Sequence, residues 1–83
     1  MRYLFAGQMK QDEFTQLVLM SGLRSEGIIN SLRGFLVLGL SEDMATLGNG
    51  VRQSNFNRDL KKLESVFANI QRYNEITGVK RIT

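Results

Sequence analysis

Apolar residues recur every three or four positions along most of the chain, which is the spacing of one face of an α-helix. The pattern predicts one helix that begins at Gln11 and ends at Ser21, and a second between the N-cap Ser25 and Gly39. A third helix, over residues 41–47, is about two turns long. No proline occurs in the sequence, so glycines separate these segments.

The longest periodic stretch follows the sequence Gly48-Asn49-Gly50, whose residues adopt positive φ most easily and therefore predict a sharp turn. Apolar residues then follow at spacings of four, three, four and three: Phe56, Leu60, Leu63, Phe67 and Ile70. This is the a/d pattern of a helical seam, and a helix from Gln53 to Tyr73 is about 31 Å long. We therefore expect an all-α fold of about four helices with a long C-terminal helix.

The second half of that helix extends past what a domain of 83 residues can cover. We therefore expect residues 62–73 to form a dimerisation extension that packs on a second copy of the chain. Its predicted interface residues are Leu63, Val66, Phe67 and Ile70. Residues 74–83 lack the pattern and are expected to be a flexible basic tail, while residues 1–9 fit either a short strand or an arm swapped between chains. No repeat or linker interrupts the chain, so residues 1–83 form a single domain.

Missing residue types exclude several kinds of chemistry. The chain has no Cys and no His, so disulfides, the usual zinc sites and Cys–His or Ser–His nucleophiles are absent. The acidic pairs Asp12-Glu13 and Glu42-Asp43 are interpreted as first-turn charges that complement a helix dipole. We expect no enzyme, metal, cofactor or small-molecule ligand, and a homodimer or higher oligomer as the reinforcement of a small fold.

Neither a signal sequence nor an apolar segment of membrane-spanning length is visible, because the apolar run at residues 35–40 is short. We therefore expect no membrane partner and a cytoplasmic protein.

The positive charge is concentrated in the second part of the chain. Residues 1–50 carry four basic and five acidic side chains, a net charge of −1. Residues 51–83 carry seven basic and three acidic side chains, a net charge of +4. This asymmetry favours a surface that faces a polyanion.

Residues 41–61 contain the parts of a helix-turn-helix unit, in which the first turns of the second helix meet DNA. Small residues, Ala45 and Thr46, allow close helix approach, and Gly50 lies in the turn. The second helix is anchored by Val51, Phe56 and Leu60. With Phe56 at the centre of the buried face, a rotation of about 100° per residue places the following residues on the opposite face: Ser54, Asn57, Arg58 and Lys61.

The start of this second helix is rich in side chains that bind DNA. The candidate DNA-binding residues are Arg52, Gln53, Ser54, Asn55, Asn57, Arg58, Lys61 and Lys62. Gln and Asn pair with adenine through two hydrogen bonds, and Arg pairs with guanine in the same way. Arg52, Lys61 and Lys62 suit phosphate contacts, which position a protein without reading sequence. We therefore expect double-stranded DNA as the partner.

Two residues close to this set in the sequence carry separate expectations. Asp59 is interpreted as an internal partner, with Lys62 as the nearest candidate. Asn49 occupies a place that is usually apolar, and it either loosens the turn or joins the phosphate contacts.

The same residues leave an alternative open, because a basic helix face is more often only solvated. In that case the chain is a helical interaction module that binds a protein partner through the seam from Phe56 to Ile70. That alternative requires the seam to be exposed in the isolated protein.

A longer pattern is carried by Ser25, Ile28-Ile29, Leu32, Phe35-Leu36-Val37, Gly39, Ser41, Phe56, Leu60 and Leu63. It resembles the PapB/FocB family of adhesin-biosynthesis transcription regulators, and the stretch 35–41 is its most distinctive part. A weaker likeness to plasmid repressors of the KorA/TrfB type rests on Arg33-Gly34, Leu36-Val37, Gly39 and Gly50-Val51. The first resemblance implies an all-helical, dimeric or higher bacterial regulator of fimbrial or plasmid promoters. It also implies reading roles for Arg52, Gln53, Ser54, Asn57 and Arg58.

Overall fold

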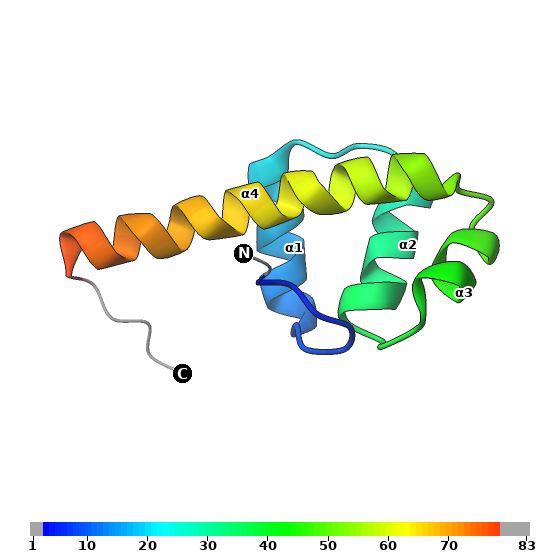
Figure 1. Cartoon of the computed structure of the whole chain (residues 1–83), viewed down its shortest axis with the longest axis horizontal. Helices are drawn as coiled ribbons and strands as arrows, with labels where there is room; N and C mark the ends of the chain where they lie inside the picture. Colours follow the sequence, from blue (N-terminus) through cyan, green and yellow to red (C-terminus); the bar gives the residue numbers. More distant parts are fainter. Residues whose placement is uncertain (1–2, 79–83) are drawn as a thin grey trace.

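The computed structural model describes residues 3–78, and its secondary structure consists of four α-helices. They are α1 (Gln11–Ser21), α2 (Glu26–Leu36), α3 (Glu42–Leu47) and α4 (Gln53–Thr77). In Figure 1, α4 lies along the length of the molecule, α1 and α2 stand side by side beneath it, and α3 lies at one end. Helix α4 contacts each of the other three helices. The expected all-α fold with a long C-terminal helix is confirmed.

The helix boundaries follow local sequence signals at most ends. Ser41 is the N-cap of α3, and its Oγ accepts a hydrogen bond from the backbone N–H of Met44 at 3.2 Å. Helix α2 ends at Leu36, three residues before the predicted stop at Gly39, because the chain tightens into a turn there. The N–H groups of both Val37 and Leu38 donate to the carbonyl of Arg33, at 2.9 and 3.2 Å.

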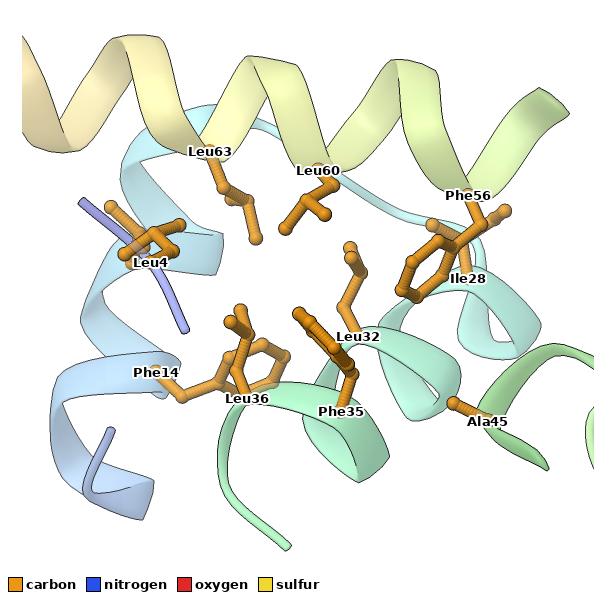
Figure 2. Packing of buried hydrophobic residues seen from close by; sticks show 11 residues of the cluster. Leu4, Phe14, Ile28, Leu32, Phe35, Leu36, Ala45, Phe56, Leu60 and Leu63 are labelled. Carbon is orange, nitrogen blue, oxygen red and sulfur yellow. The ribbon is translucent and has the colours of Figure 1, made fainter. Parts of the chain in front are cut away.

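The hydrophobic core lies between α4 and the helices beneath it (Figure 2). Phe56 is fully buried, and its ring meets the ring of Phe35 of α2 edge to face at 5.8 Å between centroids. Leu60 and Leu63 continue the buried side of α4. The predicted anchor role of Phe56 and Leu60 is confirmed.

The prediction that Leu63 lies in an interface between two chains is wrong. Its side chain is 0% exposed and points into the core of its own chain (Figure 2). A residue with no exposed surface cannot contact a second copy unless the domain opens. Leu63 therefore belongs to the domain core and not to a dimer interface.

An N-terminal arm, residues 3–9, runs across the core without forming a strand. Leu4 is buried, and the N–H groups of Gly7 and Met9 donate to the carbonyls of Phe35 and Leu36 at 3.0 and 3.1 Å. The N–H groups of Tyr3 and Leu4 donate to the carboxylate of Glu64 at 2.7 and 2.9 Å. We expected either a short strand or an arm swapped between chains. Residues 3–9 form no strand, and the arm packs on its own chain.

Helix α4 continues further than the periodic pattern indicated. Residues 74–77 were expected in a flexible tail, yet they are helical, and Thr77 Oγ1 donates to the carbonyl of Tyr73 at 3.0 Å. This end of α4 projects past α1 (Figure 1). Residues 79–83 of the expected tail lie outside the described part of the chain. No helix within residues 3–78 has both the length and the apolar character to cross a membrane.

Candidate nucleic-acid interface

Helices α3 and α4 meet through a tight turn that the sequence pattern had located. The N–H of Val51 donates back to the carbonyl of Thr46 at 3.0 Å, which closes the turn over the end of α3. Gly50 has φ +64°, a conformation that favours glycine, and nothing lies within 4 Å of where a Cβ would stand. The positive φ of residue 50, rather than contact with neighbouring atoms, therefore favours glycine at this position.

Small residues set how closely α3 approaches α2. Ala45 is 1% exposed, and a Cβ added to Gly34 would lie 3.7 Å from the Ala45 Cβ. That distance is an ordinary van der Waals contact, whereas the same Cβ would lie 3.2 Å from Leu40 Cδ1, so a side chain larger than alanine at residue 34 would displace these neighbours. The expectation that a small residue faces inward on the first helix of the unit is met by Ala45.

Asn49 acts within the turn. Its side-chain Nδ2 donates to the carbonyl of Ala45 at 2.8 Å, which satisfies one of the carbonyls left open at the C-terminal end of α3. The side chain therefore closes the end of the helix, which contradicts the alternative that it loosens the turn, while the alternative of a phosphate contact stays a prediction. Its sequence signal, a polar residue beside the turn glycine, is typical of such a cap.

Most of the predicted DNA-binding residues are exposed in the first three turns of α4. Ser54, Asn57, Arg58 and Lys61 are exposed, as are Arg52 and Gln53 at the start of the helix and Lys62 beside it. Asn55 alone of the eight candidates is half-buried. Seven of the eight candidate residues are therefore exposed at the start of α4, and we call this set the α4 basic face.

Gln53 keeps its polar group available on this face. Its Oε1 lies 3.4 Å from the hydroxyl of Thr46. That hydroxyl has one proton, and its shorter bond of 2.8 Å, to the carbonyl of Glu42, satisfies it. The contact to Gln53 is therefore secondary, and the amide remains free to bind an external group.

The charge of the α4 basic face is positive with one internal exception. Residues 52–63 carry four basic side chains and one acidic side chain, a net charge of +3. The acidic residue, Asp59, is buried at 8% exposure, and its Oδ1 accepts from Arg58 Nε at 3.3 Å. The prediction that Lys62 is the partner of Asp59 is therefore wrong. Adjacent residues on a helix point in different directions, so no sequence spacing signals the Arg58 contact, which the long arginine side chain makes by folding back.

The second half of α4 has a different surface. Val66, Phe67 and Ile70 are half-buried and pack against the edge of the core, with the Phe67 ring 5.6 Å from the ring of Tyr3. A groove of about 390 Å³ runs between α1 and this part of α4 and includes Leu17, Met20 and Ile70 in its lining. Within the described residues, no group of three or more His, Cys, Asp or Glu side chains can hold a metal ion.

Beyond the groove, α4 exposes large apolar side chains. Tyr73 is 66% exposed and Ile76 is 75% exposed. Ile76 was absent from the expected interface because it was placed in the flexible tail. The interaction-module alternative needed an exposed seam from Phe56 onward, and this is wrong for its first half, because Phe56, Leu60 and Leu63 fill the core.

The fold and this surface define a small all-helical domain with a helix-turn-helix unit at one end. The chain belongs to the PapB family of adhesin biosynthesis transcription regulatory proteins, whose family model matches residues 1–76. It is therefore a transcription regulator of that family, as the sequence pattern indicated.

A solved structure supports the fold. The crystal structure of FocB from E. coli, determined at 1.4 Å, superimposes with a TM-score of 0.82 at 22% sequence identity. The match covers 88% of this chain and 83% of the FocB chain. A comparison with curated protein sequences gives no significant match.

Proposed function

We propose that this chain regulates a fimbrial or adhesin operon by binding double-stranded DNA through the first turns of α4. The observation that carries the proposal is the α4 basic face. It stands on the second helix of a helix-turn-helix unit, it is accessible, and its only acidic residue is turned inward and paired. A surface that was only solvated would not need this segregation of charge.

The side chains divide by chemistry into two roles. Gln53, Ser54 and Asn57 carry groups that pair with base edges, and Arg58 carries a guanidinium suited to two acceptors on one base. Arg52, Lys61 and Lys62 contact phosphates and set the register of the helix on the duplex. Asn55 is half-buried, so it contributes through its exposed part only.

A dimer is the second part of the proposal. The end of α4 exposes Tyr73 and Ile76 beyond the groove beside α1, and a second copy of the chain is the partner that covers them. Val66, Phe67 and Ile70 form the inner edge of this interface. Two copies related by a two-fold axis present two α4 basic faces, so the binding site consists of two half-sites about one helical turn apart, or a multiple of that spacing.

Selection of binding sites from random duplexes tests the proposal. We expect the wild type to enrich a symmetric sequence, and Asn57→Ala to relax one base position of each half-site by about 1–3 kcal/mol. The control is Asn69→Ala, which removes an exposed asparagine from the second half of the same helix. Failure to enrich any sequence, together with an affinity that does not depend on salt, would refute DNA binding.

A further inference from the structure

Asp59 is unusual because it is the one charged residue that is buried within residues 3–78. A carboxylate is rarely buried without a partner, because removing it from water costs free energy that a hydrogen bond must offset. Its partner is Arg58, whose Nε lies 3.3 Å from Asp59 Oδ1. The Asp59 side chain is 11% exposed and the Arg58 side chain is 69% exposed. One member of the pair is therefore held by the protein, and the other reaches into solvent on the α4 basic face.

The contact engages the Nε edge of the guanidinium and favours one orientation of its end-on edge. An arginine presents five N–H donors in a planar fork, and an unrestrained arginine side chain samples many rotamers. Here the Nε–H is engaged by Asp59, which leaves the end-on pair of donors, one N–H on each of Nη1 and Nη2, directed away from that contact. Two parallel donors at the end of the fork match a pair of acceptor atoms on one base edge.

We infer that Asp59 is a positioning residue that orders Arg58, so that its two terminal nitrogens read one base pair of the DNA site. The inference rests on the proposed function. An arginine that contacts only phosphates strengthens binding to every sequence alike. The buried carboxylate instead converts the charge at residue 58 into sequence preference.

The free protein gives the first test, which requires no DNA. Nitrogen-15 relaxation of the arginine Nε–H groups compares Arg58 with Arg52, whose side chain makes no hydrogen bond or ion pair within residues 3–78. We expect the Arg58 Nε–H to be the more ordered of the two, and Asp59→Asn to reduce its order to that of Arg52. Equal mobility of the two groups in the wild type overturns the inference.

The second test measures base preference on the selected site. The position that Arg58 reads is the one at which Arg58→Ala abolishes preference, and we expect that preference to be at least about fivefold in the wild type. Asp59→Asn, which keeps the size of the side chain, should reduce the preference severalfold. It should not weaken binding to an unrelated duplex, because the substitution removes a negative charge near the phosphates. Thermal unfolding of the variant checks that the domain still folds.

The matched control is Arg58→Lys, which keeps the positive charge and lacks the guanidinium fork. It should lower the preference, because a lysine ammonium lacks the planar fork of donors, and Asp59→Asn should have no further effect on preference in that background. If Asp59→Asn leaves the preference of the wild type intact, the inference is wrong. If Arg58→Ala weakens all duplexes equally, Arg58 contacts phosphate, and the inference fails while the proposed function stands. Absence of any sequence-preferring binding by the wild type contradicts the proposed function itself.

Discussion

The two halves of α4 belong to one continuous helix but have opposite surfaces. Residues 53–63 bury one side against the core, where α4 contacts α2 and α3, and they expose polar and basic side chains. Residues 64–77 bury no residue completely, carry one basic and two acidic side chains for a net charge of −1, and expose Tyr73 and Ile76. The first half is therefore fixed by its own domain and presents charge. The second half packs on the N-terminal arm and α1 and leaves two large apolar side chains exposed.

The largest effect is expected from the core of the first half. Phe56→Ala removes a fully buried ring that packs edge to face on Phe35, and it should lower the free energy of unfolding by about 3–5 kcal/mol. Urea denaturation followed by circular dichroism measures the change. Tyr73→Ala, an aromatic loss in the exposed second half, should stay within about 0.5 kcal/mol in the monomer. Similar losses for both variants would show that the halves do not differ in burial.

The second prediction tests association through the exposed end of α4. Ile76→Ser removes a 75% exposed apolar side chain, and it should weaken the proposed dimer by about 2 kcal/mol, or roughly thirtyfold in dissociation constant. Sedimentation velocity over a range of protein concentrations measures this. Leu47→Ser, which removes an 81% exposed side chain from α3, serves as the control and should leave the dimer intact. Dissociation by the control alone would place the interface at the other end of the molecule.

The third prediction concerns the contact that holds the N-terminal arm to the second half. Glu64→Gln replaces a carboxylate that accepts two backbone N–H groups, and its amide nitrogen cannot accept the second of them. The free energy of unfolding should fall by about 1–2 kcal/mol. Hydrogen exchange at the amides of Tyr3 and Leu4 should become faster.

The matched control for this change is Glu75→Gln, an exposed glutamate in the same half of α4. It should alter neither the exchange rates of the arm nor the free energy of unfolding. If Glu64→Gln also leaves both unchanged, other contacts hold the arm, and the second half of α4 is less dependent on it than its burial indicates.

Local and periodic features were the ones that sequence alone could predict. The N-cap Ser41, the turn at Gly50 and the exposed residues of the α4 basic face all follow from the chemistry of neighbouring residues and a helical rotation. The a/d seam could not show where the core ends, because its spacing is uniform from Phe56 to Ile70 while complete burial stops at Leu63.

Contacts between distant or adjacent residues escaped prediction for a different reason. The bonds from the arm to Glu64 join residues 60 and 61 positions apart, and no local pattern marks such a pair. The Arg58–Asp59 contact joins neighbours whose directions on a helix differ, so it depends on how one flexible side chain folds back. Both depend on three-dimensional packing that periodicity does not encode.

The smallest predicted effect tests the difference between the two halves of α4 most directly, because it compares the loss of one basic side chain from each half. Lys61→Ala should weaken binding to all duplexes about equally and reduce the slope of log affinity against log salt by about 1, as expected for one lost phosphate contact. Arg72→Ala should leave the slope unchanged, because residue 72 lies about 16 Å further along the helix, which exceeds the screening length at physiological salt. Fluorescence anisotropy of a labelled duplex over a series of KCl concentrations measures both slopes. Equal reductions would mean that DNA follows the whole helix. In that case the second half of α4 could not also be covered by a second copy of the chain, so this small difference in slope decides whether one helix performs two separate tasks.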